Sequence, residues 1–300
     1  MAEQRDILVE FAHLRDAAVA VSQLLKGIRT YLSNVHSNPA ENIELEARLG
    51  RLRDGHFESN VGQQTFLHIL QLLESYPRWT RVSPWHETHD VFYNVRVPSG
   101  DAMASASTGQ NVQVRTSVGT DAKGGVKIVH NTKRRLRSLD MEMHLVDAFS
   151  CAMSTSVDGK TDGLDVRVAA NVETVVPPEG LPIAILPSCV RIKQRKRFLL
   201  SSLGVDNETF AYELSIVYHG KSKHEAEQKQ SNRQDPSFEV ELECLQPRAY
   251  LRSSNGEDLM LALSLLLKCY DFARILHPSS NVTYIPRTLK VHEHDQADID

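Results

Sequence analysis

Apolar and polar residues alternate along most of the middle of the chain, and this pattern predicts strands. Segments with a two-residue period, or rich in β-branched residues, lie at 42–49, 85–97, 111–119, 125–138, 141–155, 163–176, 188–199, 208–218 and 238–246. Successive side chains of a strand point to opposite faces, so each segment is expected to present one apolar and one polar face. The middle of the chain is therefore expected to form one β-rich domain.

A helical period replaces the alternation in three places. Apolar residues recur at helical spacing between Gln4 and Leu32, which predicts a long amphipathic helix. A shorter helix is expected from Val61 to Tyr76, because Pro77 disfavours helical backbone in the residue before it. A third follows Asn255-Gly256-Glu257-Asp258, a favourable N-terminal cap, and runs through leucine-rich sequence to Leu276. These helices are expected to cover the outside of the β-rich domain.

The remaining segments are polar and lack either period. Ser99 to Gln110 and Gly220 to Ser237 are expected to be disordered, since they offer little apolar surface to bury. The whole chain, 1–300, is interpreted as one domain, with an N-terminal helix at 1–34, strands across 41–246, a C-terminal helix at 254–277 and a loose acidic tail at 289–300.

Three of the predicted strands carry charges of one sign on their polar face. Glutamates recur every second residue in Glu44-Leu45-Glu46 and in Glu239-Val240-Glu241-Leu242-Glu243. Cations do the same in Arg191-Ile192-Lys193-Gln194-Arg195-Lys196-Arg197. Like charges about 7 Å apart on a strand repel by roughly 2–3 kcal/mol at an effective dielectric of about 20. Such faces are either open to solvent, which is the simpler interpretation for any one strand, or offset by opposite charges across an enclosed space.

An enclosed space accounts for all three strands, because the opposite face of each is apolar and suited to a core. If the apolar faces pack under the helices, the charged faces point into a closed antiparallel β-barrel. Other predicted strands place charged residues on the same inner side, namely Arg115, Lys133, Arg167, Glu173 and Glu213. We therefore expect an α+β fold, in which helices cover a closed barrel with a nearly charge-balanced lumen.

The expected lumen combines the groups needed to bind a metal and a polyphosphate. Carboxylates on facing strands offer oxygen ligands to a hard cation such as Mg²⁺ or Mn²⁺, and Arg and Lys match phosphate oxygens. Phosphoryl transfer depends mainly on positioning and on neutralising charge, so the pattern favours hydrolysis of the terminal phosphate of a triphosphate. A non-catalytic module that binds polyphosphate or RNA ends is the alternative, although acid beside the phosphates would not help such a module.

Composition restricts these alternatives. The net charge of −4 and the pI near 6.4 exclude a generally basic nucleic-acid coat, so a polyanion must meet a local patch. The cysteines form no C-x-x-C pair and are expected to be reduced thiols; they are Cys151, Cys189, Cys244 and Cys269. The longest apolar stretch, Leu259 to Leu267, is too short to span a bilayer, and no membrane association is expected.

Three motifs, in order along the chain, resemble those of the metal-dependent RNA triphosphatases of fungal and protozoan mRNA capping. They are Glu44-Leu45-Glu46, Arg191-Ile192-Lys193-Gln194-Arg195 and Glu239-Val240-Glu241-Leu242-Glu243. These enzymes belong to the triphosphate tunnel metalloenzymes, and the resemblance covers about Glu41 to Leu245, with an overall form similar to a protozoan, kinetoplastid member. It implies that the barrel is an eight-stranded triphosphate tunnel.

The resemblance also implies roles for individual residues. Glu44, Glu46 and Glu243 would bind the metal. The catalytic residues would be Arg115, Lys193 and Arg195 at the terminal phosphate, and Glu173, helped by Glu241, at the attacking water. Further substrate contacts would come from Lys133, Arg167, Arg191 and Arg197, with Glu239 bracing the basic strand. The chain departs from the family at Arg167, where a Lys is common, and at Ala169, where a small hydroxyl residue is common.

The implied reaction is metal-dependent hydrolysis of the γ-phosphate of 5′-triphosphate RNA, with Mg²⁺ or Mn²⁺ as cofactor. The 5′-diphosphate product would be the substrate of a guanylyltransferase, which is therefore a candidate partner, and the protein would act in the nucleus. Tripolyphosphate and free nucleoside triphosphates remain alternative substrates for the same tunnel.

Overall fold

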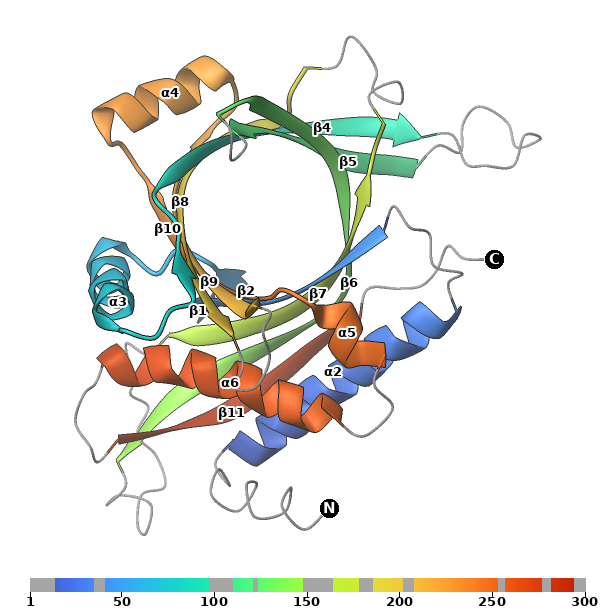
Figure 1. The fold of residues 1–300 in the computed structure, drawn as a ribbon, viewed down its shortest axis with the longest axis vertical. Coiled ribbons are helices and arrows are strands. Elements are labelled where there is room, and N and C mark those ends of the chain that lie inside the picture. Colours follow the sequence, from blue (N-terminus) through green and yellow to red (C-terminus); the bar gives the residue numbers. More distant parts are fainter. Residues whose placement is uncertain are drawn as a thin grey trace.

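Eight antiparallel strands close into a barrel, which Figure 1 shows end-on. The computed structural model describes residues 14–34, 41–97, 110–120, 124–147, 164–177, 186–201, 208–252, 257–276 and 282–293. The barrel strands are β1 (Glu41–Arg53), β4 (His86–Val97), β5 (Gln110–Thr120), β6 (Val126–Asp147), β7 (Asp165–Val175), β8 (Cys189–Ser201), β9 (Glu208–Gly220) and β10 (Ser237–Cys244). They follow the order β10-β9-β8-β4-β5-β6-β7-β1, and the antiparallel pairing of β1 with β10 closes the ring. The predicted fold class is confirmed.

Three further strands extend the wall of the barrel. β2 (His56–Glu58) pairs with β1, β3 (Arg81–Val82) with β8, and β11 (Val282–Glu293) with β6. β11 was not predicted from the sequence, and it includes residues 289–293 of the segment expected to be a loose tail. Residues 294–300 lie outside the described part of the chain.

The partner of β11 is a strand of 22 residues, β6, where the sequence predicts two separate strands. The segments at 125–138 and 141–155 form one strand as far as Asp147, and residues 148–155 lie outside the described part. A register shift between Arg135 and Arg137 marks a β-bulge within β6. The first part of the strand therefore belongs to the barrel wall, while the last part also carries β11.

Helices cover the lower side of the barrel in Figure 1. α2 (Arg15–Asn34) and α6 (Glu257–Leu276) lie side by side there, with the short α5 (Pro247–Arg252) next to them, and α3 (Gln63–Ser75) packs beside β10. The helices predicted at 61–76 and after Asn255 are confirmed. The long N-terminal helix is confirmed from Arg15 onward, and residues 4–13 lie outside the described part.

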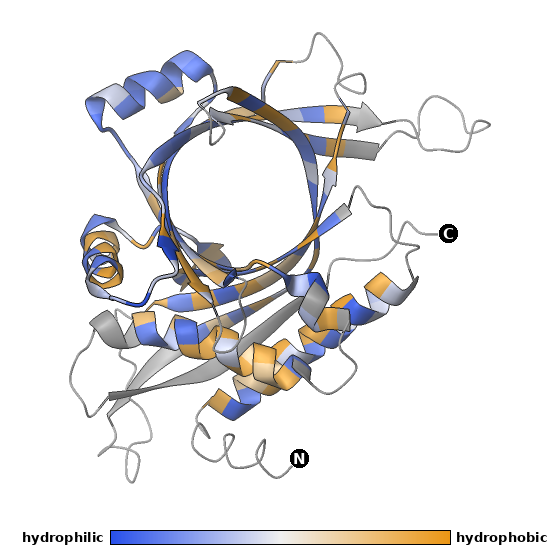
Figure 2. Cartoon of the chain, viewed as in Figure 1, coloured by the Kyte–Doolittle hydropathy of each residue, from blue (hydrophilic) through white to orange (hydrophobic). Residues whose placement is uncertain are grey.

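The apolar core lies between these helices and the outer face of the barrel. Leu45, Val168 and Leu242 on the outer face are buried in one cluster with Leu25 of α2 and Leu265 of α6. Figure 2 shows the apolar residues of α2 and α6 in orange beneath the barrel. The apolar face of each predicted strand thus packs outward, which leaves the charged faces to the lumen.

The prediction that residues 220–237 are disordered is wrong, because α4 (Lys223–Asn232) lies within them. The first turn of this helix is capped, since the Ser222 hydroxyl accepts a hydrogen bond from the backbone N–H of Glu225. Ala226 is the buried residue of the helix and packs against the outer face of β8. The cap and the contact of Ala226 stabilise this surface helix without an apolar face, so its sequence lacks the helical spacing of apolar residues that predicts a helix.

Three cysteines lie in the described part of the chain, and all are free thiols, as predicted; they are Cys189, Cys244 and Cys269. Of the other segment expected to be disordered, residues 99–109 lie outside the described part, and Gln110 begins β5. None of the described helices has both the length and the apolar character needed to cross a membrane.

Gly50 of β1 lies where β2 approaches closely, and a larger side chain there should destabilise the fold. A Cβ atom at this position would overlap the carbonyl oxygen of Glu58 and the ring of Phe57. Gly50→Ala is therefore expected to lower the free energy of unfolding by about 1–3 kcal/mol, measured by urea denaturation. Gly27→Ala is the control, because a Cβ there meets the flexible end of Arg137. An equal loss in both variants would contradict the prediction.

Candidate active site

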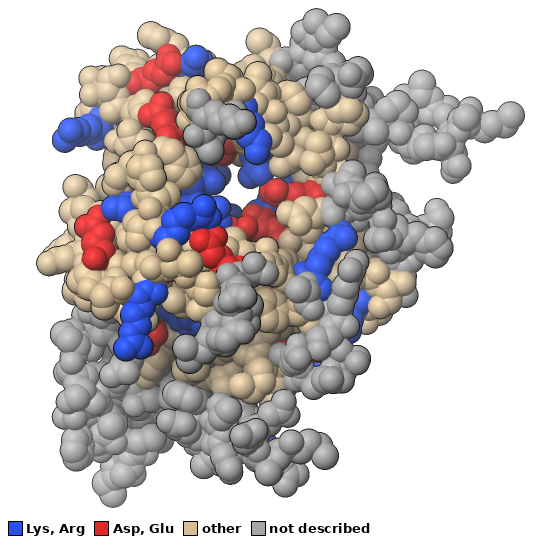
Figure 3. Space-filling model, in the orientation of Figure 1, with Lys and Arg blue, Asp and Glu red and all other residues tan. Residues whose placement is uncertain are grey.

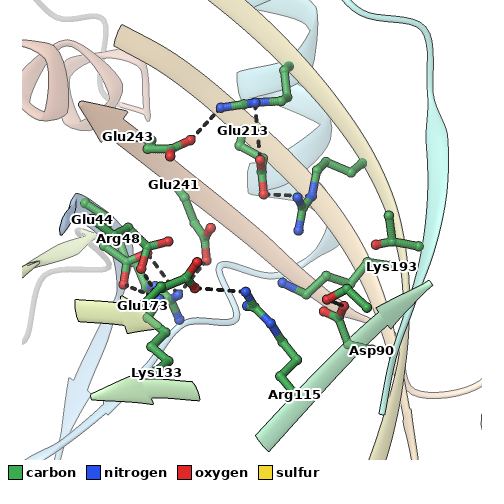
Figure 4. Close-up of a pocket in the computed structure, with 15 residues that line it drawn as sticks. Glu44, Arg48, Asp90, Arg115, Lys133, Glu173, Lys193, Glu213, Glu241 and Glu243 are labelled. Carbon is green, nitrogen blue, oxygen red and sulfur yellow. Dashed lines mark hydrogen bonds and ion pairs between the residues drawn. The ribbon is translucent and has the colours of Figure 1, made fainter. Parts of the chain in front are cut away.

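The lumen of the barrel contains a polar cavity of about 250 Å³, to which every barrel strand contributes a side chain. Seven of the lining residues are carboxylates and six are cations. Figure 3 shows charges of both signs around the central opening, and Figure 4 shows the side chains that point into it. The lining consists of Glu44, Glu46, Arg48, Thr88, Asp90, Arg115, Ser117, Lys133, Glu173, Lys193, Arg195, Arg197, Glu213, Glu241 and Glu243.

The carboxylates gather on β1 and β10, the two strands whose pairing closes the barrel. Glu46 lies directly opposite Glu243 in this register, and Arg48 lies opposite Glu241. The Nη2 atom of Arg48 is 3.1 Å from Oε2 of Glu46 and 3.1 Å from Oε1 of Glu241. Like charges directly opposite each other destabilise a pair of strands, so Arg48 stabilises the pairing at this point.

Glu44 and Glu46 also have partners on β6 and β7. The ammonium group of Lys133 contacts the Glu44 carboxylate and lies 3.4 Å from Oε1 of Glu46. The side-chain amide of Asn171 donates hydrogen bonds to Glu44 at 3.2 Å and to Glu46 at 3.1 Å. Three strands, β1, β6 and β7, are thereby linked through two carboxylates inside the lumen.

Glu46 and Glu241 hold their negative charge firmly. Although burial opposes ionisation, Arg48 and Lys193 lower the pKa of Glu241 to about 2. Burial likewise raises the pKa of Glu46, but Arg48 and Lys133 together bring that pKa below its ordinary value. Both groups are weak bases as a result, and both remain anionic beside the neighbouring cations.

Glu44 and Glu243 show the opposite behaviour. Burial, followed by the nearby charge of Glu46, raises the pKa of Glu44. Burial raises the pKa of Glu243 to about 7, against the effect of Arg197, whose Nη2 atom donates a hydrogen bond to Glu243 at 2.5 Å. The cations near these two glutamates therefore do not fully offset the effect of burial on their carboxylates.

Cations on β8 and β5 face the acidic cluster across the cavity. The Nε atom of Arg195 lies 2.8 Å from Oε1 of Glu213, and Arg115 donates a hydrogen bond of 2.8 Å to Glu173. Figure 4 shows Arg115 and Glu173 linked in this way. Each arginine has further N–H groups, since a guanidinium has five donors.

Lys193 differs from the arginines because its ion pair is long. Its side chain is 7% exposed, it makes no hydrogen bond with a described residue, and its nearest carboxylate contact is Glu239 at 3.9 Å. Burial and the neighbouring charge of Arg191 lower the pKa of the Lys193 ammonium group. A buried cation without a close anion is unfavourable, so an anion bound beside Lys193 would be stabilised.

All but three of the predicted site residues line the cavity; the three are Arg167, Arg191 and Glu239. Arg167 instead donates hydrogen bonds of 2.6 and 2.8 Å to the buried carboxylate of Asp140. Arg191 and Glu239 form an ion pair of 2.7 Å. The structure thus gives both arginines a carboxylate partner away from this cavity.

Sequence reasoning gave no role to several residues that line the cavity. The sequence pattern places Glu213 on an inward face without a role, and it assigns no role to Arg48 or Asp90. Asp90 accepts a hydrogen bond of 2.6 Å from the Ser117 hydroxyl. The signal that could have identified Asp90 is its alternation with Thr88 on one face of a predicted strand.

The glutamates predicted to bind a metal have the oxygen donors that Mg²⁺ and Mn²⁺ prefer. Within the described part of the chain, no three His, Cys, Asp or Glu side chains converge as metal ligands. Instead, Glu44 and Glu46 are turned toward Lys133, and Glu243 toward Arg197. The raised pKa values of Glu44 and Glu243 arise mainly from burial, which the cations now beside these carboxylates do not offset. The donor set therefore fits a divalent cation, provided that these side chains turn away from their present partners.

Glu243 is expected to make stability depend on pH. Its pKa of about 7 in the folded chain is above the ordinary value of 4.5, so between these values the folded chain holds a proton that the unfolded chain has released. Stability is then lost as the pH rises through this window. Glu243→Gln should be increasingly more stable than the wild type from pH 4.5 to 7, in thermal denaturation with a chelator present. A difference that does not change with pH would contradict this assignment.

The fold is similar in shape to those of solved RNA triphosphatases. The S. pombe Pct1 RNA triphosphatase is 14% identical, with a TM-score of 0.49 over 84% of this chain and 92% of Pct1. Pct1 in complex with the Spt5 CTD has a TM-score of 0.46 at 14% identity, over 84% of this chain and 92% of that one. The Mimivirus capping enzyme triphosphatase is 11% identical, with a TM-score of 0.45 over 85% of this chain and 97% of its own. No protein-family model matches the sequence, and no curated protein does.

Proposed function

We propose that the protein is a metal-dependent RNA 5′-triphosphatase that removes the γ-phosphate and leaves a 5′-diphosphate end. The observation that carries the proposal is the position of Lys193, a buried cation whose ion pair with Glu239 is as long as 3.9 Å and which shares its cavity with a cluster of glutamates. Polyphosphate binding would supply the missing anion. The ordered motifs on β1, β8 and β10 support the same reaction.

The terminal phosphate would lie between β8 and β5. Lys193 and Arg195 alternate along β8, so both point inward, and Arg115 reaches the same cavity from β5. The Nε atom of Arg115 is buried without a hydrogen-bond partner among the described residues. Guanidinium groups bind phosphate oxygens bidentately. Their charge would stabilise a transition state in which negative charge is spread over the phosphoryl oxygens.

The attacking water would be oriented by Glu173. This carboxylate lies 2.8 Å from Arg115, so a water bound to it would lie next to a phosphate held by Arg115. Glu241, with a pKa of about 2, is a poor acceptor for a proton. Its proposed part is to fix Arg48, and through that guanidinium the acidic strands.

Glu44, Glu46 and Glu243 would hold the divalent metal, for which Mg²⁺ and Mn²⁺ are the candidates. A metal bound there would neutralise charge on the phosphate oxygens. The cavity has one carboxylate more than it has cations, so a polyanion alone would add to its negative charge. Binding of the metal together with the triphosphate reduces this excess.

The proposed substrate is the 5′ end of nascent RNA, which a guanylyltransferase would cap in the nucleus after the γ-phosphate is removed. Tripolyphosphate and free nucleoside triphosphates offer the same phosphates and are the alternative substrates. A non-catalytic binding module fits less well, because it would gain nothing from Glu44 and Glu46 beside the phosphates.

The first experiment measures phosphate release from RNA labelled on its terminal phosphate, with Mg²⁺ or Mn²⁺, beside labelled ATP and tripolyphosphate. Preferential release from RNA that stops on addition of a chelator is the expected result. Release from the small substrates alone would contradict the RNA assignment while keeping the phosphohydrolase chemistry. No release from any substrate would favour a binding module.

Glu46→Gln tests the metal site. The substitution keeps the size of the side chain and removes one ligand charge, so hydrolysis is expected to fall by a factor of about 100 or more. Circular dichroism should show a folded protein. Glu74→Gln is the matched control, because Glu74 is an exposed partner of Lys196 on the outside of the barrel. Rates near the wild type for Glu46→Gln would contradict the assignment of the metal site.

A further inference from the structure

A second cavity of about 250 Å³ adjoins the first within the barrel. Arg115 and Lys133 line both cavities, so the two are neighbours along the lumen. The second is lined in addition by Phe92, Gln113, Arg135 and Asn171. Its lining contains no carboxylate, in contrast to the seven of the first cavity.

Arg135 is the unusual group of this second cavity. It makes no hydrogen bond or ion pair with any residue that the structure describes, although Arg48, Arg115 and Arg167 each have a carboxylate partner. Burial and the nearby charge of Arg167 lower the pKa of Arg135. A half-buried guanidinium beside other cations favours the binding of an anion.

The rest of the lining suits a nucleoside. Phe92 points to the lumen, since it alternates with Asp90 on β4, and it lies opposite Arg115 in the pairing of β4 with β5. An aromatic ring offers a stacking surface to any base. The side-chain amide of Gln113 can donate and accept hydrogen bonds, whereas Asn171, whose amide N–H groups bond to Glu44 and Glu46, offers its carbonyl oxygen as an acceptor. The aromatic ring suits a base, the amide groups suit the polar atoms of a base or a ribose, and the guanidinium of Arg135 suits a phosphodiester.

We propose that this second cavity binds the first nucleotide of the RNA, with its base on Phe92 and its 3′-phosphodiester on Arg135. The proposal rests on the proposed function, because the triphosphate of the same nucleotide would occupy the first cavity. Lys133, which lines both cavities, would then contact the phosphate nearest the ribose, while Arg115 keeps its place at the terminal phosphate. The subsite would let the tunnel distinguish an RNA end from tripolyphosphate, which has no nucleoside.

Phe92→Leu and Arg135→Gln test the subsite. A stacked base contributes roughly 1–3 kcal/mol, so Phe92→Leu is expected to raise KM for a short 5′-triphosphate oligoribonucleotide about tenfold. Hydrolysis of tripolyphosphate should change less than about twofold in both variants. Arg135→Gln should also reduce the slope of log affinity against log salt by about 0.7, as expected for one lost contact to a phosphate of a single strand.

Matched controls come from the outer faces of the same strands. Tyr93→Leu removes an aromatic ring next to Phe92, and Arg134→Gln removes a cation next to Arg135; both should keep wild-type KM for both substrates. The Arg134 side chain points away from the lumen, toward Tyr31 of α2. Equal losses for RNA and tripolyphosphate in the Phe92 and Arg135 variants would overturn the subsite, as would RNA kinetics identical to the wild type.

A failure of the proposed function can be distinguished from a failure of the nucleotide subsite. If the wild-type protein does not hydrolyse RNA, equilibrium binding of the same oligoribonucleotide and of tripolyphosphate replaces kinetics as the measurement. Weaker binding of the oligoribonucleotide alone in Phe92→Leu and Arg135→Gln would still support the subsite. Unchanged binding of the oligoribonucleotide would overturn it, whatever the wild-type activity.

Discussion

Arg48 lies where β1 pairs with β10, and the closed barrel depends on the charge it places there. Its guanidinium contacts Glu46 and Glu241 at 3.1 Å each, at a point where Glu46 also faces Glu243 across the strands. Removing one partner of a buried ion pair typically costs about 3–5 kcal/mol, since the other charge is left uncompensated. Closure of the barrel and the charge of its cavity thus depend on the same side chain.

Ion pairs of this kind also explain why the lumen is open. The interior of an eight-stranded barrel is just wide enough for side chains to fill. Here Lys133, Arg115 and Arg195 are held near the wall by carboxylates of other strands. The cavity remains between them, while the apolar core forms outside the barrel under α2 and α6. The helices are therefore a requirement of the fold, because the barrel has no apolar interior of its own.

The sequence predicted most of the barrel because alternation is a local property. α4 escaped prediction because Ala226 is its only buried residue, and β11 because its partner lies far away in the chain. Most site residues were identified because like charges repeat every second position. The Asp140–Arg167 ion pair was not foreseen, since the bulge in β6 reverses the face to which Asp140 belongs. The alternation of odd- and even-numbered residues therefore predicts which face of a strand a side chain occupies only up to the first β-bulge.

The bulge divides β6 into two parts, and the side chains that face the lumen are odd-numbered in the first part and even-numbered in the second. Before it, odd-numbered residues such as Lys133 and Arg135 face the lumen; after it, Ser138 and Asp140 pair with inward-facing positions of β7. Arg137, at the bulge between the two parts, lies beside Gly27 of α2. A one-residue insertion or deletion elsewhere in β6 would reverse only half of the strand. The length of β6 on each side of the bulge is therefore under tighter constraint than the identity of its outward-facing residues.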